Sequence, residues 1–240
     1  MKPYNHTDSD KSEEVREMFD RIAPKYDLLN HTLSANVDRL WRRRVMRIVR
    51  RRHPRRILDV ATGTGDLALL LARRLRETRI LGLDPSEGML AEARRKIARE
   101  GLDERITLQQ GSAEKMPEIA DATFDAVTVA FGVRNFGDAE QGLREMLRTL
   151  KPGGQIVILE FSTPTGPLIG RLYRWYSHTV LPRIGGIVSK DRSAYEYLPA
   201  SVDEFPSPDR FLALMEQTGY RNCRARSLSF GIAQIYTAER

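Results

Sequence analysis

A glycine-containing turn between an apolar strand and an amphipathic helix constrains the fold of this chain more than any other feature. Residues 56–66 read RILDVATGTGD, and the apolar run at 57–60 is typical of a buried parallel strand. Apolar residues then recur at helical spacing, at Leu67, Leu70, Leu71 and Leu75. Because Gly63 and Gly65 lack a Cβ, the turn can adopt positive φ and lie against a ligand, beside the free N–H groups that open the helix. The stretch therefore predicts a strand–turn–helix unit that binds a nucleotide cofactor.

Two cofactors fit this unit. Asp84 ends the next apolar strand, where a carboxylate can accept both hydroxyl protons of a ribose. Gly63, Gly65 and Ala68 together with Asp84 satisfy the dinucleotide fingerprint, but S-adenosylmethionine (SAM) is bound by the same kind of unit. Asp59 favours SAM, because a carboxylate there can meet the ammonium of the methionine moiety and would repel a pyrophosphate. The turn by itself leaves NAD and SAM open.

The order of apolar strands and amphipathic helices predicts an α/β fold. Strands are expected at 57–60, 81–84, 106–108, 124–131 and 155–161, and two more near 223–228 and 232–237. The first five end in loops at one edge of the sheet, which is where open parallel sheets bind ligands. In the helix after the second strand, Glu92 and Lys96 are spaced for an i,i+4 ion pair on the outer face.

The 240 residues are expected to form a single domain, 1–240. Its segments are an N-terminal helical arm (1–53), a cofactor-binding core (54–162), an inserted lid that faces the substrate and membrane (163–206), and a C-terminal helix with two strands (207–240). In the arm, Pro24 is expected to end the first helix. The lid is inferred from a change of pattern, since prolines, aromatic residues and paired glycines replace the regular periodicity.

The formal net charge is +7, and much of the positive charge precedes the first strand. Arginines and apolar residues alternate from 39 to 56, which predicts a basic amphipathic helix. Such a helix is either a solvated face whose arginine stems cover apolar surface, or an element that lies on a membrane. No apolar run approaches the roughly 18 residues that cross a bilayer, and no signal peptide is visible, so a cytoplasmic location is expected. Cys223 is the only cysteine, and no metal site is expected.

The order of motifs along the core resembles the class I SAM-dependent methyltransferases. After the glycine turn and Asp84 come the Ser112-Ala113 loop, a strand that ends at 130–132, and the sequence LKPGG at 150–154. This resemblance implies a Rossmann-like fold, with a seven-stranded, mostly parallel sheet and helices on both faces. It also implies SAM as the methyl donor, and the catalytic acid and nicotinamide-facing region that a dehydrogenase needs are not visible.

A closer resemblance covers nearly the whole chain. The sequences YDLLN at 26–30, FGVRN at 131–135, LKPGG through EFS at 150–162 and YEYL at 195–198 are similar to those of the quinone-biosynthesis C-methyltransferases of the UbiE/MenG type. These enzymes are the demethylmenaquinone and polyprenyl-benzoquinol methylases. Asp38 stands where their first signature usually has histidine, and Leu29 where it usually has methionine, which leaves substrate-side detail open.

The resemblance assigns cofactor contacts and a reaction. Thr62, Asp84, Ser112 and Ala113 are the implied SAM contacts, beside the backbone of Gly63 and Gly65. Thr62 would offer its hydroxyl or N–H to the amino-acid end of SAM, and Met89 is either a cover for the adenine or a core residue. The implied reaction is C-methylation of a polyprenyl quinol, with demethylmenaquinol as first choice and a methoxy-benzoquinol as alternative.

Methyl transfer from a sulfonium needs an electron-rich acceptor, so the substrate must be the reduced quinol. Loss of a phenolic proton, with an ordinary pKa near 10, activates the neighbouring ring carbon. Arg134 and Asn135 are expected to stabilise the phenolate, although Arg134 is also spaced to form a surface ion pair with Asp138. The candidate general bases are Asp27, His31, His178 and Tyr195.

The polyprenyl tail of such a quinol lies in the membrane. The basic helix and residues 168–176, which are rich in aromatic and basic side chains, predict reversible binding to an anionic membrane surface, on the cytoplasmic face of the inner membrane. An RNA methyltransferase is a rival, but the Asn/Asp-Pro-Pro-aromatic motif of base N-methyltransferases is missing after the fourth strand, and no nucleic acid is expected as partner. A non-catalytic SAM-binding protein is a second rival. The sequence does not fix the oligomeric state.

Overall fold

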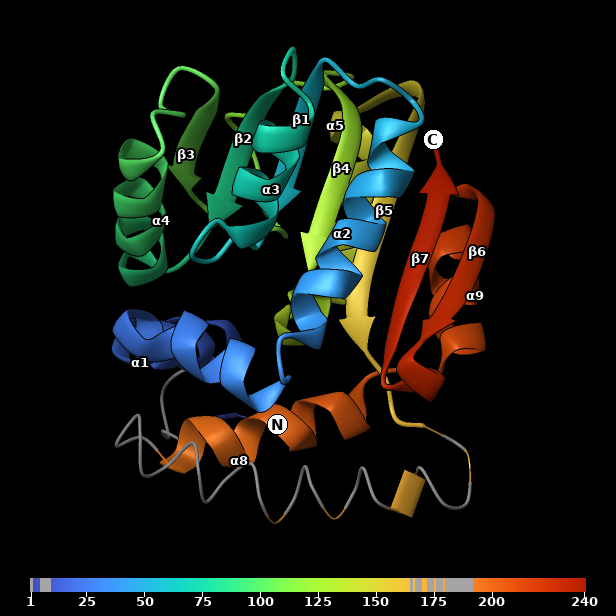
Figure 1. Cartoon of the computed structure of the whole chain (residues 1–240). Coiled ribbons are helices and arrows are strands. Elements are labelled where there is room, and N and C mark those ends of the chain that lie inside the picture. Colours follow the sequence, from blue (N-terminus) through green and yellow to red (C-terminus); the bar gives the residue numbers. More distant parts are fainter. Residues whose placement is uncertain are drawn as a thin grey trace.

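The computed structural model describes residues 2–4, 10–164, 166, 170, 171, 175, 179 and 192–240. Seven strands form one sheet in the order β3-β2-β1-β4-β5-β7-β6 (Figure 1). The strands are β1 (Arg56–Val60), β2 (Arg79–Asp84), β3 (Ile106–Gln110), β4 (Phe124–Ala130), β5 (Leu150–Phe161), β6 (Arg221–Leu228) and β7 (Ala233–Glu239). The first five are parallel, and β7 runs antiparallel to both β5 and β6. The predicted class I methyltransferase fold is confirmed.

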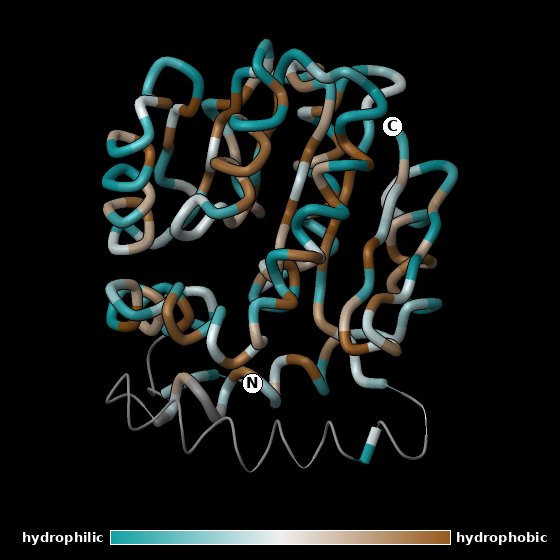
Figure 2. Tube along the Cα trace, in the orientation of Figure 1, coloured by the Kyte–Doolittle hydropathy of each residue, from teal (hydrophilic) through white to brown (hydrophobic). Residues whose placement is uncertain are grey.

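Helices cover both faces of the sheet (Figure 1). One face carries α2 (Val37–Arg50), α3 (Asp66–Arg74) and α4 (Glu87–Arg99), and the other carries α5 (Ala139–Thr149) and α9 (Pro208–Gln217). Each face has its own buried apolar cluster, because strands that are covered on both sides are apolar throughout. Figure 2 shows this as brown segments along the central strands and the inward sides of the helices.

A third layer crosses the carboxyl ends of the parallel strands. It consists of α1 (Lys11–Leu33) and α8 (Arg192–Glu204) (Figure 1). Val15, Met18 and Ile22 of α1 pack in one buried cluster with Ala194 and Tyr197 of α8. The predicted arm and the described part of the predicted lid therefore pack together over the edge of the sheet where ligands bind.

The prediction that Pro24 ends the first helix is wrong, because α1 continues through Pro24 to Leu33. A proline inside a helix costs about 3 kcal/mol. Buried residues on both sides of it, among them Ile22 and Leu29, tie the two halves of α1 to the protein and offset that cost. The helix α8 likewise contains Pro199.

The basic helix predicted before the first strand is α2, and its apolar face is used inside the protein. Trp41, Val45, Met46 and Val49 are buried in the cluster that covers the sheet. Only the basic face is left for an outside partner. No helix in the described part of the chain is long and apolar enough to cross a membrane.

Candidate functional site

A cavity of about 390 Å³, here called the glycine-turn cavity, lies where β1 to β4 end and α1 begins to cross them. The strand ends contribute loops to one side of it, and α1 covers the other. Its lining includes Gly63, Asp84, Met89, Ser112 and Ala113 on the sheet side, and Val15, Phe19 and Tyr26 from α1. Four of the six predicted cofactor contacts therefore lie together, with Met89 beside them.

The two glycines of the turn have different tasks. Gly63 has a φ of +57°, lines the cavity, and a Cβ added to it would meet no atom within 4 Å. Gly65 has a φ of +81° at the N-cap of α3, and an added Cβ would lie 3.3 Å from the Cβ of Ala93 in α4. Gly63 therefore leaves the backbone open to a ligand, whereas Gly65, which does not line the cavity, permits the turn and its packing.

Asp84 points from the end of β2 toward the turn. Its Oδ2 accepts the N–H of Gly63 at 2.8 Å, and its Oδ1 accepts the N–H of Ser86 at 2.9 Å. Burial raises the pKa of Asp84 to about 6, although the hydrogen bonds from Ser86 and Gly63 act to lower it. Each ionised oxygen retains a lone pair, which suits the predicted contact with ribose hydroxyls.

Asp59 and Thr62 lie beneath the turn, and neither lines the cavity. The Thr62 hydroxyl donates to Asp59 at 2.7 Å, and its N–H donates to the carbonyl of Leu83 at 3.0 Å. The second oxygen of Asp59 accepts the hydroxyl of Thr128 at 2.6 Å. These hydrogen bonds support the turn, and the contacts of Asp59 and Thr62 with the methionine moiety stay predictions.

The wall of the glycine-turn cavity also contains Ser112, Ala113 and Met89. The Ser112 hydroxyl donates to Glu114, and Ala113 is buried between the cavity and the core. Met89, near the start of α4, is buried as a core residue and also borders the cavity, so its contact with adenine stays a prediction.

A second cavity of about 260 Å³, here called the aromatic cavity, lies beside the first, among α1, α2 and α8. The rings of Phe131 and Phe161 stack in its wall with centroids 4.4 Å apart, and Trp41 packs edge-on against Phe161. The guanidinium of Arg42 lies 5.4 Å from the ring of Phe131, and that of Arg134 lies 5.3 Å from the ring of Phe161. The cavity is thus flat-walled and apolar, with two buried cations against its rings.

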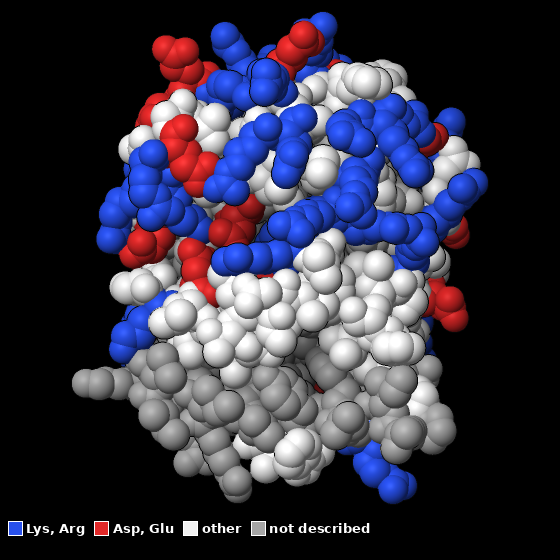
Figure 3. Space-filling view, viewed as in Figure 1, with Lys and Arg blue, Asp and Glu red and all other residues white. Residues whose placement is uncertain are grey.

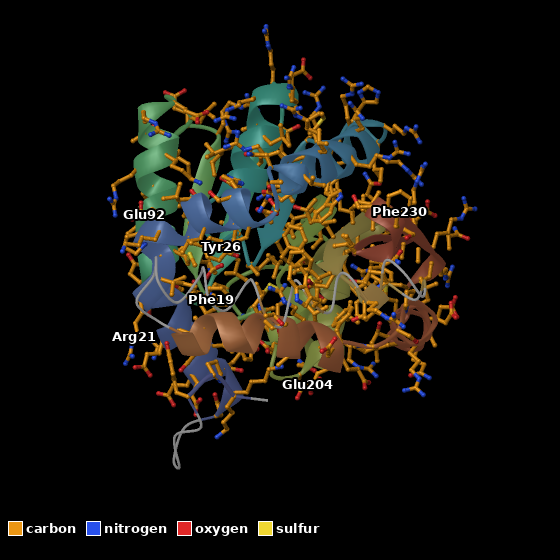
Figure 4. All side chains as sticks on the ribbon, turned by 60° about the horizontal axis from the view of Figure 1, so that its bottom comes forward. Phe19, Arg21, Tyr26, Glu92, Glu204 and Phe230 are labelled. Carbon is orange, nitrogen blue, oxygen red and sulfur yellow. The ribbon has the colours of Figure 1, made fainter. Side chains whose placement is uncertain are left out.

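Four residues line both cavities, namely Phe19, Tyr26, Phe131 and Asn135. Figure 4 shows Phe19 and Tyr26 side by side on α1, and their ring centroids are 5.9 Å apart. Burial raises the pKa of Tyr26, while the charges of Arg134 and Arg42 act to lower it. Both cations therefore act on a phenol at the junction of the cavities.

Sequence reasoning did not assign a function to Tyr26. The signal was present, since Tyr26 opens the YDLLN motif and lies on one helical face with Phe19 and Ile22. The expected end of the helix at Pro24 placed Tyr26 outside that face.

Arg134 lies at the wall of the aromatic cavity, and its side chain is buried. Its Nη1 donates to Oε1 of Glu160 at 2.8 Å and to the carbonyl of Phe131, and its Nε donates to Ser201 at 3.3 Å. Its Nη2 has no hydrogen-bond partner within the described residues and is available to a ligand. The alternative ion pair with Asp138 does not form, because Asp138 caps α5 by accepting the N–H of Gln141.

Asn135 follows Arg134 in a short 3-10 turn, Val133–Asn135. Its Oδ1 accepts the hydroxyl of Tyr197 in α8 at 3.2 Å. The pair links the end of β4 to the predicted lid, at the place where the two cavities meet.

Two of the candidate bases are described, Asp27 and His31, and neither lines either of these cavities. Asp27 accepts a hydrogen bond from Lys96 at 2.7 Å. Lys96 also contacts Asp66 at 2.6 Å, so the predicted Glu92–Lys96 pair is wrong: the carboxylates of α1 and α3 hold Lys96 on the inner side of α4. His178 and the side chain of Tyr195 lie outside the described residues.

His31 joins the two parts of the N-terminal arm to the core. Its Nδ1 lies 2.8 Å from Asp38 and its Nε2 lies 3.3 Å from Asp66. The hydrogen bond to Asp66 raises the pKa of His31 more than burial lowers it. These three side chains are close enough to hold a metal ion, but Arg42 pairs with Asp38 and Lys96 with Asp66, so both carboxylates are already neutralised.

The comparison with known families is decisive for the class of protein. The model of the ubiE/COQ5 methyltransferase family matches residues 7–240. The chain belongs to this family. The ubiquinone/menaquinone biosynthesis C-methyltransferase UbiE of Geobacter sulfurreducens is 52% identical over 97% of this chain and 90% of the relative. The demethylmenaquinone methyltransferase of Bacteroides fragilis is 45% identical over 99% of this chain and 96% of the relative.

The fold has solved counterparts. A SAM-dependent methyltransferase from Thermotoga maritima superposes with a TM-score of 0.63 at 19% identity, over 94% of this chain and 99% of that one. The predictions of a SAM-dependent methyltransferase and of a part in quinone biosynthesis are confirmed by family membership and by these near full-length relatives.

Proposed function

We propose that this methyltransferase adds a methyl group to a ring carbon of a polyprenyl quinol, and that demethylmenaquinol is its acceptor. The observation that carries the proposal is the junction of two cavities at Tyr26, Phe131 and Asn135. One cavity is built on a glycine turn and a carboxylate, and the other is aromatic with Arg134 in its wall. A donor and a flat acceptor placed in them would meet at that junction.

The residues present fit SAM. Gly63 leaves open space against its backbone, Asp84 can hold the ribose hydroxyls, and the Ser112-Ala113 loop can bond the adenine edge through backbone groups. When bound, SAM supplies an electrophilic methyl group. Phe19 and Tyr26 line the junction, so their rings would shield the reacting atoms from water.

The aromatic cavity suits a quinol ring. A flat ring fits beside the stacked Phe131 and Phe161, and Nη2 of Arg134, which has no hydrogen-bond partner among the described residues, could donate to a phenolate oxygen. The positive charge of Arg134 would favour loss of the phenolic proton, with water as the proton carrier. Arg134 is fixed before the reaction by Glu160, so its alignment needs no rearrangement.

We propose further that the enzyme binds reversibly to an anionic membrane through the outer face of α2. Arg43, Arg44, Arg47 and Arg50 make no ion pair within the described chain, and Figure 3 shows a continuous basic band across α2. Each arginine near anionic lipid contributes about 1 kcal/mol. Vesicles that contain anionic lipid should co-sediment the protein at low salt. Equal sedimentation with neutral vesicles would contradict the proposal.

The test of the acceptor is methyl transfer from labelled SAM to a short-chain demethylnaphthoquinol and, in parallel, to a methoxy-benzoquinol. The name of the Geobacter sulfurreducens relative covers both biosyntheses, which makes the benzoquinol the necessary comparison. We expect faster turnover of the naphthoquinol. Preference for the benzoquinol would correct the substrate, and no turnover of either with normal SAM binding would refute quinol methylation.

A further inference from the structure

The turn between β6 and β7 exposes a phenylalanine to solvent, and its backbone adopts an unfavourable left-handed conformation there. Phe230 is 82% exposed and has a φ of +60°, and its neighbour Ser229 has a φ of +47°. Bulky residues rarely adopt this left-handed region, and an exposed aromatic ring forgoes the free energy of burial. A residue that is unfavourable in both respects indicates a function for the outward-facing ring.

Phe230 lies beside the aromatic cavity. Its neighbour Ser229 lines that cavity and accepts a hydrogen bond from Nε1 of Trp41 at 2.9 Å. Leu40 precedes Trp41 in α2 and is 57% exposed. Figure 4 shows Phe230 well apart from Phe19 and Tyr26, which lie on the α1 side of the molecule. Two large apolar side chains thus project into solvent on the side of the cavity formed by α2 and the β6–β7 turn.

Five arginines lie on the two elements next to these side chains, α2 and β6. Arg43, Arg44 and Arg47 follow Leu40 at i+3, i+4 and i+7, so they share its helical face. Arg224 and Arg226 are exposed on the edge strand β6, which leads to Phe230. None of the five forms a salt bridge within the described residues. In Figure 3 the basic band reaches from α2 toward the edge of the sheet that carries β6.

We propose that Phe230 and Leu40 insert into the surface of an anionic lipid bilayer and hold the mouth of the aromatic cavity against it. A polyprenyl tail would then remain in lipid while its ring enters the cavity, which rests on the function proposed above. A bilayer satisfies the apolar side chains and the surrounding arginines together. A nucleic acid would satisfy only the arginines, because its phosphate backbone offers nothing to an exposed phenylalanine and leucine.

The test compares the full chain with its Leu40→Ser/Phe230→Ser variant on vesicles of phosphatidylglycerol and phosphatidylcholine. We expect the double variant to sediment with roughly tenfold lower affinity, since two apolar side chains lose their burial in lipid. Leu28→Ser is the matched control, because Leu28 is 65% exposed but lies on α1, and its binding should be unchanged. Turnover of a soluble short-chain quinol should be equal in the full chain and the two variants, and only the double variant should lose turnover of a long-tailed quinol in vesicles.

A Phe230→Trp variant gives an independent readout, because its added fluorescence should be quenched by brominated lipid. Unchanged sedimentation of the double variant together with no added quenching would overturn the proposal. So would an equal loss in Leu28→Ser, or binding to an RNA duplex in preference to vesicles. Failure of the unaltered chain to methylate any soluble quinol would refute the proposed function, while the vesicle results would still decide the docking surface.

Discussion

Arg134 and Glu160 form a buried ion pair in which Nη1 of the arginine lies 2.8 Å from Oε1 of the glutamate. The glutamate also accepts the backbone N–H groups of Arg134 and Phe161, so it is held firmly in place. Arg134 lines the aromatic cavity and Glu160 does not, which places the carboxylate behind the guanidinium. The pair therefore fixes a cation toward the acceptor cavity, with Glu160 as the positioning residue.

The first prediction concerns this cation. Arg134→Ala should lower turnover by about 100-fold or more, as loss of a donor to a developing oxyanion does, and should leave the dissociation constant of SAM unchanged. It also leaves the buried Glu160 without its countercharge, at a cost of about 3–5 kcal/mol in unfolding free energy. The double variant Arg134→Met/Glu160→Gln removes that uncompensated charge. It should regain stability in denaturant titrations without regaining turnover, and recovery of turnover would assign Arg134 a structural role only.

The second prediction separates the two glycines of the turn. Gly63→Ala places a methyl group in the glycine-turn cavity, so SAM affinity should fall at least tenfold, with about 1–2 kcal/mol of strain from the left-handed φ. Gly65→Ala has the same kind of strain, and its new methyl group also presses against Ala93. Gly65→Ala should therefore lose more unfolding free energy than Gly63→Ala. Calorimetric titration measures the SAM affinity of each variant, and thermal unfolding measures its stability. A Gly63→Ala variant that binds SAM normally would contradict the placement of the cofactor.

The third prediction follows from the buried carboxylate beneath the turn. Burial raises the pKa of Asp59 to about 6, against the hydrogen bonds from Thr128 and Thr62, whereas the unfolded value is 3.8. The folded state therefore binds more protons between these values, and the wild type loses stability as pH rises through this window. The unfolding free energy of Asp59→Asn minus that of wild type should therefore rise by about 2–3 kcal/mol between pH 4 and 6. Above pH 6 this difference should stay constant. A difference that is constant with pH would refute this assignment.

The fourth prediction concerns His31, whose pKa is also raised in the folded protein. The hydrogen bond to Asp66 raises the pKa of His31, so the stability that protonated His31 contributes is fully present below the unfolded value of 6.5 and is lost as pH rises through the folded value. His31→Gln should therefore destabilise the protein more at pH 5.5 than at pH 9. Chemical denaturation at the two pH values measures this. An equal loss at both would show that folding does not raise the pKa of His31.

Features carried by local sequence were predicted well. The strand at 57–60, the glycines of the turn and Asp84 were all recognised, because short-range periodicity and backbone sterics determine them. The outer arginines of α2 were recognised for the same reason. Arg134 and Asn135 were selected from their position just past the fourth strand, and the structure brings both to the aromatic cavity.

Features that depend on tertiary contacts were missed. Pro24 lies within α1 and Pro199 within α8, because burial of both helices outweighs the cost of proline. Lys96 points inward to Asp27 and Asp66, which only the docking of α1 brings near. Tyr26 was taken as one member of a motif, because its position between two cavities follows from how α1 crosses the sheet.

The most direct test is a single methyl-transfer assay with labelled SAM and demethylmenaquinone, either reduced with dithionite or left oxidised. The account predicts label in the ring of the reduced form only, since only the quinol can give the phenolate that Arg134 stabilises. Equal labelling of the oxidised quinone would contradict the mechanism. No labelling of the quinol by an enzyme that binds SAM would contradict the function itself.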